Sequence, residues 1–249
     1  TRDFSKSISC VLEKGTRTRE QEEELVTEFV IALISECCEL NYEYPDIKEI
    51  PEFISIKADK GWADLMSEKI EYVASCDTQP KLIFPGAFNP LHDGHEAMSK
   101  LAEKETGAKT FFEICIQNVD KPPLSYHQIN RTINQFDSTQ DWVLTKAGKF
   151  SDKAKLFPNS TFIIGADTLV RIFDERFYAS RSDMLAQFDI FNKNNNRFLV
   201  FGRKYQDKFI ELKDVQLPDS ISSLFKGFGE NIFREDISSS SIRLENSEE

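Results

Sequence analysis

The fold is decided by one stretch of the sequence, which reads LIFPGAFNPLHDGH from Leu82 to His95. A short apolar run, Leu82–Phe84, leads directly into a turn that contains Gly86, and a helix is expected to begin near Gly94. In open α/β sheets, ligands bind at such strand-to-helix turns, outside the carboxyl end of a parallel strand. The stretch therefore indicates both the class of fold and the position of a binding site.

The sequence beyond this stretch repeats the alternation of strand and helix. Four more apolar runs follow, at Phe111–Ile116, Trp142–Thr145, Thr161–Ile164 and Phe198–Phe201. Segments expected to be helical lie near Gly94–Lys104, Ser125–Phe136, Ala166–Asp174 and Ser182–Phe191. Short buried runs separated by helices predict a mainly parallel sheet that is covered on both faces. We therefore predict an α/β fold, a Rossmann-like α/β/α sandwich.

The first 79 residues are expected to form a smaller α/β segment that ends in a linker. Its expected elements are a strand at Ile8–Leu12, a helix from Thr18 to about Cys38, a short helix at Trp62–Glu68, an extended run at Ile70–Ala74 and a linker at Cys76–Pro80. Thr18 and Gln21 have the spacing of a capping box, which marks the start of a helix. The chain thus divides into residues 1–79 and a second domain of residues 80–249.

Composition excludes several classes of partner. The 249 residues include 42 acidic and 31 basic side chains, which gives a net charge of −11. Proteins that bind long nucleic acids by neutralising phosphates normally carry the opposite sign, so we expect no nucleic-acid partner. No stretch approaches the roughly 18 apolar residues that span a bilayer, so we expect no membrane partner. Because the sequence begins with Thr1, we expect that a preceding segment has been removed.

The five cysteines are odd in number and form no CxxC pair. This usage is typical of reduced thiols in a cytoplasmic protein, which is the location that we predict. The sequence leaves the oligomeric state open, with a homo-oligomer among the options.

The helix that follows Leu91 is expected to bind phosphate. The N-terminus of a helix offers free N–H groups and the positive end of the helix dipole. His92 and His95 are three residues apart, so both imidazoles can point to one side and donate hydrogen bonds to a phosphoryl oxygen as charge develops. Gly86 would let the backbone approach a phosphate, and Gly94 would relieve crowding against a nucleotide. Two other interpretations stay open: turn histidines hydrogen-bonded to the backbone, and a metal pair, for which no further ligands lie at zinc spacing.

A second candidate segment lies near the C-terminus, from Ile237 to Arg243. Ser238, Ser239 and Ser240 open an expected helix and present hydroxyls and backbone N–H groups to a polyphosphate, while Arg243 adds a planar cation. The alternative is a disordered serine-rich tail.

The two segments together resemble the signatures of one enzyme superfamily. Residues 86–95, GAFNPLHDGH, resemble the HxGH motif of the nucleotidylyltransferase superfamily, in the form found in nicotinamide or nicotinate mononucleotide adenylyltransferases. Residues 237–243 resemble its second signature, ISSTxxR, with Ser240 in the position of the Thr. The resemblance extends from Lys81 to the C-terminus. It implies that His92, His95 and Arg243 are catalytic and that Ala87, Phe88 and Asn89 belong, with Gly86 and Gly94, to the nucleotide-binding segment.

Three further segments agree with this resemblance. Residues 118–124 resemble the family's basic loop, in which Lys121 would contact phosphate, the alternative being a solvated lysine. Gly165 and Asp167 match the GxD segment, where the glycine lets the nucleotide approach and the Asp holds a ribose or caps a helix. Arg203, after Phe201 and Gly202, matches a position beside the adenine and phosphates, or is only a surface charge. Arg131 matches a family arginine less specifically.

The resemblance implies transfer of AMP from ATP to the phosphate of nicotinamide or nicotinate mononucleotide, with release of pyrophosphate. ATP and a phosphate-bearing small molecule would be the partners, and Mg²⁺ would be carried by ATP, since the sequence has no carboxylate cluster for it. Alternatives are transfer to pantetheine phosphate, cytidylyl transfer from CTP, and a catalytically silent nucleotide sensor. A class I aminoacyl-tRNA synthetase is disfavoured because no KMSKS-type segment is present. Residues 14–20 resemble the end of a CinA-like domain, and a scaffold appendage is the other interpretation.

Overall fold

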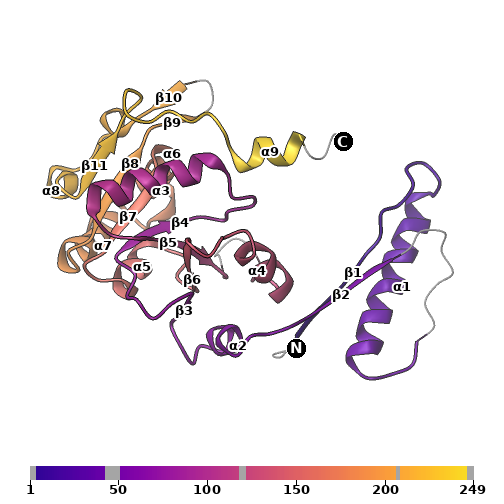
Figure 1. Cartoon of the computed structure of the whole chain (residues 1–249). Coiled ribbons are helices and arrows are strands. Elements are labelled where there is room, and N and C mark those ends of the chain that lie inside the picture. Colours follow the sequence, from indigo (N-terminus) through magenta and orange to yellow (C-terminus); the bar gives the residue numbers. More distant parts are fainter. Residues whose placement is uncertain (1–3, 43–50, 118–121, 206–207, 246–249) are drawn as a thin grey trace.

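The computed structural model describes residues 4–42, 51–117, 122–205 and 208–245. A seven-stranded sheet lies between two layers of helices (Figure 1). In spatial order the strands are β11 (Phe225–Phe228), β8 (Arg197–Phe201), β7 (Thr161–Gly165), β4 (Leu82–Pro85), β5 (Thr110–Cys115), β6 (Asp141–Thr145) and β3 (Tyr72–Ala74). All neighbouring strands are parallel except β3 and β6, which are antiparallel. The predicted α/β sandwich with a mainly parallel sheet is confirmed.

Both faces of the sheet are buried, which explains why its strands are continuous apolar runs in the sequence. Along β4, for example, Leu82 and Phe84 belong to one hydrophobic core and Ile83 to the other. The helices that contribute to the first core are α2 (Lys60–Met66), α3 (Asp93–Thr106) and α4 (Tyr126–Ile133). Those of the second core are α5 (Phe150–Leu156), α6 (Ala166–Ile172), α7 (Arg181–Lys193) and α8 (Asp219–Ser222).

Several short elements were not predicted from the sequence. They are α5, α8, β11, the antiparallel strands β9 (Arg203–Tyr205) and β10 (Lys208–Ile210), and the 3₁₀ turns η1 (Glu175–Phe177) and η2 (Leu212–Asp214). Strand β11 contains both Lys226 and Gly227, so it lacks the apolar run that marks a buried strand. In α5 the buried residues include a lysine, Lys153, which interrupts the apolar pattern expected of a core-facing helix. The last helix is α9 (Ser239–Glu245).

The N-terminal unit is made of β1 (Phe4–Ser9), α1 (Arg19–Cys37) and β2 (Glu52–Lys57), and it lies beside the main body (Figure 1). The capping box of α1 is present: the backbone N of Thr18 donates to Oε1 of Gln21 at 2.9 Å. The prediction of a strand at Ile8–Leu12 was wrong, because the antiparallel partner β2, which was not predicted, pairs with residues 4–9 and leaves Val11 91% exposed. The unit contacts the main body through α4.

Part of the chain before residue 80 belongs to the main sheet. Strand β3 pairs with β6 at the sheet edge, and the fully buried Leu65 of α2 lies in the core. The ring of Trp62 in α2 stacks on Tyr126 of α4, with 6.3 Å between the ring centroids. The division at residues 79 and 80 stays a prediction, but α2 and β3 pack with the domain that was expected to follow them.

Within the described residues, every helix is too short or too polar to cross a membrane. All five cysteines lie in described segments, and none forms a disulfide.

Candidate active site

The turn between β4 and α3 is shaped by a phenylalanine. Phe88 has a left-handed backbone (φ 43°) and is 1% exposed, with its ring against those of Phe84, Phe112 and Phe136. A Cβ at Gly86 would lie 2.6 Å from the Phe88 ring. The space that Gly86 was expected to leave for a phosphate is therefore filled by Phe88. The Phe88 side chain belongs to the core, so Phe88 can face a nucleotide only through its backbone.

A side chain without any motif holds the same turn. The amide of Gln135, just beyond α4, donates from Nε2 to the carbonyl of Phe88 and accepts at Oε1 from the backbone N of Leu91, both at 2.9 Å. The two hydrogen bonds tie Phe88 and Leu91 to the same side chain and so fix the backbone that leads to His92. Gln135 was missed in the sequence, because nothing in its spacing distinguishes it from other polar residues near a helix end.

The two histidines of the motif lie face to face at the start of α3. Their ring centroids are 3.7 Å apart with 25° between the planes, and the backbone N of His92 donates to Nδ1 of His95 at 3.3 Å. Neither Nδ1 nor Nε2 of His92 has surface in contact with solvent or a hydrogen-bond partner among the described residues. Leaving buried polar atoms unpaired is costly, so this ring is a candidate to bind a ligand.

Both imidazoles are held neutral. Burial, the neighbouring His92 and the positive charge of Arg203 lower the pKa of His95 to about 3. Burial and Arg203 also lower the pKa of His92, against an opposing effect of Asp93. A neutral imidazole still carries one N–H donor, so each ring can donate to a phosphoryl oxygen without being charged.

A small pocket adjoins the histidines. It is lined by His92, Gly94, His95, Met98, Gly165, Phe201, Gly202, Arg203, Phe233, Glu235 and Ile237. Its volume of about 20 Å³ has room for about one water molecule. Ile237 closes it: a Cβ at Gly94 would lie 2.9 Å from Cγ2 of Ile237. At this volume the pocket does not accommodate a triphosphate.

The C-terminal serine–arginine segment contacts the motif turn. Oγ of Ser239 donates to the carbonyl of Pro90 at 2.8 Å, and Nη1 of Arg243 donates to the carbonyl of Asn89. Arg243 also donates from Nη2 to Oγ of Ser240 at 3.1 Å. The structure thus brings together two segments that lie about 150 residues apart in sequence.

The first turn of α9 is capped by the same segment. The hydroxyl of Ser238 accepts from the backbone N of Ser241 at 3.1 Å and is 2.5 Å from the Ser241 hydroxyl. A helix therefore starts here, and the alternative of a disordered tail does not describe residues 238–245.

A third part of the site comes from β7, α6 and β9. Asp167 does not cap α6, because the cap position is taken by Gly165 and the Asp side chain makes no cap hydrogen bond. Instead Oδ2 of Asp167 lies 3.9 Å from Nη1 of Arg203, and its buried Oδ1 has no partner in the described part of the chain. A Cβ at Gly165 would lie 2.4 Å from Oδ1 of Asp167, so the glycine makes room for this carboxylate.

The remaining predicted residues are less informative. Ala87 and Asn89 are exposed on the turn, and Arg131 is exposed on α4. Lys121 lies outside the described residues. Among the residues that the structure does describe, His92 and His95 belong to no group of three or more His, Cys, Asp and Glu side chains that could hold a metal ion.

The pocket occupies one half of the sheet. Its lining comes from α3, β7, β8 and the C-terminal segment, so it lies over the carboxyl ends of β4, β7 and β8. Strands β5 and β6 lie on the other side of β4. Their carboxyl ends therefore form the other half of the same edge.

Comparison with known proteins identifies a family for the chain. The model of a family described as cytidylyltransferase-like matches residues 83–245. No curated protein matches the chain. Among solved structures, the chain is similar to Plasmodium falciparum nicotinic acid mononucleotide adenylyltransferase complexed with NaAD, with 17% identity and a TM-score of 0.36 over 67% of this chain and 83% of that chain.

Proposed function

The chain belongs to the cytidylyltransferase-like family, and from this premise we propose that it transfers AMP from ATP to the phosphate of nicotinamide or nicotinate mononucleotide. The family makes it a nucleotidyltransferase, which binds a nucleotide and a phosphate-bearing substrate. The choice of ATP and of a pyridine mononucleotide rests on the GAFNP form of the first motif and on Gly165 and Asp167.

One observation supports the proposal most. Ser239 and Arg243 are hydrogen-bonded to Pro90 and Asn89, directly before a histidine whose two ring nitrogens have no partner among the described residues. A triphosphate that entered between these segments would meet hydroxyl, guanidinium and imidazole donors at once. Such preorganised donors stabilise developing negative charge where water is excluded.

In the proposed reaction, an oxygen of the acceptor phosphate attacks the α-phosphorus of ATP in line. The new P–O bond forms as the bond from the α-phosphorus to the oxygen that bridges to the β-phosphate breaks, and pyrophosphate leaves. The acceptor phosphate is already ionised, so no residue has to remove a proton. The protein therefore acts mainly by positioning and charge stabilisation.

Each residue has a role in this scheme. The neutral rings of His92 and His95 donate N–H groups to α-phosphoryl oxygens. Ser238, Ser239, Ser240 and Arg243 bind the β- and γ-phosphates, and Arg203 is near enough to Asp167 to orient it toward a ribose. Lys121 is proposed to neutralise phosphate on the acceptor or on the α-position. Mg²⁺ would arrive with ATP as part of the substrate, coordinated by the phosphates.

The carboxyl ends of β5 and β6 are proposed to receive the acceptor. We assign ATP to the small pocket beside the histidines, here called the ATP pocket, which lies over β4, β7 and β8. The second substrate must then approach from the remaining part of the edge. In-line attack also requires the attacking oxygen of the acceptor to lie opposite the leaving pyrophosphate across the α-phosphorus.

A substrate matrix tests the proposal. The protein is incubated with ATP or CTP and with nicotinamide mononucleotide, nicotinate mononucleotide, pantetheine phosphate or a phosphoalcohol, and pyrophosphate release is measured. We expect release with ATP and one pyridine mononucleotide. Release with CTP and a phosphoalcohol would instead identify a cytidylyltransferase, the activity from which the family takes its description. Nucleotide binding without release in any combination would indicate a sensor.

A further inference from the structure

A buried ion pair lies beneath the half of the sheet edge that the mechanism leaves to the acceptor. Nζ of Lys153, on α5, donates to both carboxylate oxygens of Glu113, on β5, at 2.7 Å. The hydroxyl of Thr145, the last residue of β6, donates to Oε1 of the same carboxylate at 2.5 Å. Glu113, Lys153 and Thr145 are 1%, 4% and 0% exposed, so all three lie out of reach of bulk solvent.

These three residues, which we call the edge triad, connect the ends of two strands to the motif turn. The backbone N of Ala147, beyond β6, donates to Oγ1 of Thr145 at 3.2 Å. The backbone N of Ile116, beyond β5, donates to the carbonyl of Thr145 at 2.8 Å. The backbone N of Gly86 donates to the carbonyl of Glu113 at 3.0 Å. Main-chain bonds of Glu113 and Thr145 thus join the segments after β4, β5 and β6, and the side chains of the edge triad tie these two residues to each other and to α5.

Stability alone does not account for this arrangement. Removing two charges from water is expensive, and buried ion pairs are often replaced by apolar side chains without loss of stability. The same pair, however, imposes a geometry. The carboxylate accepts three hydrogen bonds, two from Lys153 and one from Thr145, and these bonds fix the positions of both donors. A buried pair at the functional edge of the sheet is therefore suited to positioning.

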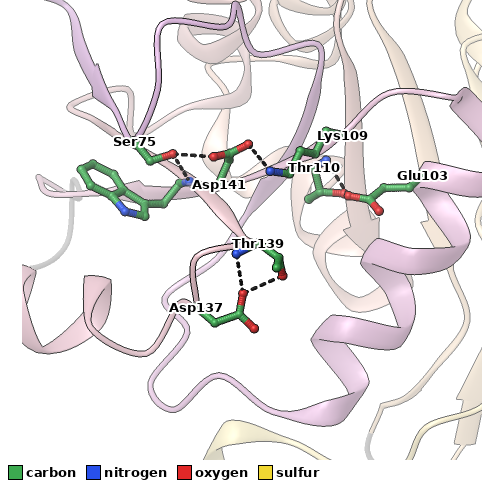
Figure 2. A network of polar contacts seen from close by, with 8 residues as sticks. Ser75, Glu103, Lys109, Thr110, Asp137, Thr139 and Asp141 are labelled. Carbon is green, nitrogen blue, oxygen red and sulfur yellow. Dashed lines mark hydrogen bonds and ion pairs between the residues drawn. The ribbon is translucent and has the colours of Figure 1, made fainter.

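The opposite ends of β5 and β6 offer an internal comparison. There Nζ of Lys109 lies 2.8 Å from Oδ2 of Asp141, and Oγ of Ser75 donates to Oδ1 of Asp141 at 2.9 Å (Figure 2). The Lys109 side chain is 52% exposed, and the pair joins the linker before residue 80 to the amino ends of the strands. It lies on the same two strands as the edge triad but at the edge where no substrate is proposed to bind.

We propose that Glu113, Lys153 and Thr145 are positioning residues that set the geometry of the acceptor half of the site. The proposal rests on the proposed function in that it assigns the acceptor to the ends of β5 and β6. It assigns no contact with substrate to the edge triad. The lining of the ATP pocket includes no residue of β5, β6 or α5, so the edge triad acts on one substrate and not on the other.

The double variant Glu113→Leu/Lys153→Met tests the proposal, because it removes both charges together, and only the Thr145 hydroxyl loses its acceptor. We expect a melting temperature near that of the unmodified protein, a KM for the acceptor raised about tenfold or more, and a KM for ATP within about twofold. Amide hydrogen exchange at Ala147 and Ile116, measured without substrates, should become faster. The matched control is Lys109→Met/Asp141→Leu on the same strands, which should change neither KM nor these two amides.

The outcomes separate the possibilities. An unchanged acceptor KM in a folded double variant, with unchanged exchange at Ala147 and Ile116, overturns the proposal. If the double variant does not fold, Thr145→Val keeps the ion pair and removes only the hydroxyl, and the same changes are expected from it at smaller size. If the unmodified protein releases no pyrophosphate with any acceptor, the proposed function fails, and the exchange measurement alone decides whether the edge triad orders this edge.

Discussion

The two ends of strands β5 and β6 carry similar residues and treat them differently. At the amino ends, Asp141 binds Lys109 and Ser75 near solvent (Figure 2). At the carboxyl ends, Glu113 binds Lys153 in the dry interior. Ionisable groups left without a hydrogen-bond partner follow the same division. In the described part of the chain, the buried unpaired atoms at the carboxyl edge include those of His92 and Asp167, whereas those near the amino edge are the neutral Thr110 and Asn196.

This difference teaches how function is distributed over the sheet. A fold that only needed stability would satisfy its ionisable groups at both edges equally. Here Asp141 of the amino edge is paired with near neighbours, and the carboxyl edge keeps a buried ion pair and an unpaired imidazole. Buried ionisable groups that lack partners are expensive, so their position among the described residues favours the carboxyl edge as the functional one.

The largest expected effect concerns stability at the carboxyl edge. Glu113→Leu alone should lower the free energy of unfolding by about 3–5 kcal/mol, because it leaves Lys153 buried without a partner. Urea denaturation at pH 7 measures the change. A loss below about 1 kcal/mol would mean that water reaches Lys153, and the contrast between the edges would disappear.

The next effect is on catalysis. His92→Ala should slow pyrophosphate release by about 100-fold or more while ATP binding persists, because a donor to the developing charge is lost. His127→Ala, which removes the remaining histidine of the chain from α4, is the matched control and should leave the rate unchanged. Equal rates for the two variants would exclude His92 from the reaction.

Helix α3 reaches both edges, and its two terminal glycines sharpen the comparison. Gly94→Ala should raise the KM for ATP about tenfold, since the new Cβ would meet Ile237 at 2.9 Å and the His92 ring at 3.1 Å. Gly107→Ala, at φ 70°, should instead cost about 1 kcal/mol of stability and leave KM unchanged. Steady-state kinetics and urea denaturation of both variants test whether one substitution changes KM and the other changes stability. A kinetic change in Gly107→Ala would contradict it.

Acid should weaken the two edges in different pH windows. The pKa of His95 is about 3 in the folded chain against 6.5 in the unfolded chain. The unfolded state therefore takes up a proton first, and stability falls as the pH drops from about 6.5 toward 3. For Asp141, burial alone would raise the pKa, but hydrogen bonds from Lys109 and Ser75 lower it below 3.8. The stability that Asp141 contributes is complete above that value and is lost only at lower pH.

Measuring the free energy of unfolding at pH 7 and at pH 5 distinguishes the two pH windows. Between pH 7 and pH 5, the free energy of unfolding of His95→Gln should fall by about 1–2 kcal/mol less than that of the unmodified protein, since glutamine does not titrate. Asp141→Asn should lose as much as the unmodified protein. A reduced acid loss in Asp141→Asn would show that its carboxylate, and not the imidazole, titrates in this range.

The smallest effect is expected from Asp141→Asn at pH 7. An ion pair with a half-exposed lysine contributes at most about 1 kcal/mol, and the amide can still accept from Ser75. Chemical denaturation and the KM of both substrates should be close to those of the unmodified protein. A loss of unfolding free energy as large as that of Glu113→Leu would mean that the ion pairs at the two edges contribute equally to stability.

The sequence predicted those parts of the molecule in which one residue pattern suffices. Strands β4 to β8 were found because a sheet buried on both faces requires continuous apolar runs. The approach of Ser239 and Arg243 to the histidine turn followed from two motifs of one superfamily.

Other features depend on contacts whose spacing carries no pattern. Lys153 lies 40 residues from Glu113, and Gln135 lies 47 residues from Phe88, so neither partner could be identified from the sequence. The position of β1 was wrong because its register is set by β2, beyond α1. Gly86 was assigned to phosphate, whereas the demand for a glycine comes from the Phe88 ring two residues later.

Strand β3 has a practical consequence for anyone who shortens the chain. It covers the outer side of β6, where the fully buried Val143 and Leu144 lie. A version beginning at residue 80 would lack β3 and expose a row of unpaired backbone N–H and C=O groups beside those apolar side chains. Bare strand edges of this kind join between molecules and lead to aggregation. Trimming the protein to its nucleotide-binding part therefore requires retaining at least residues 60–79.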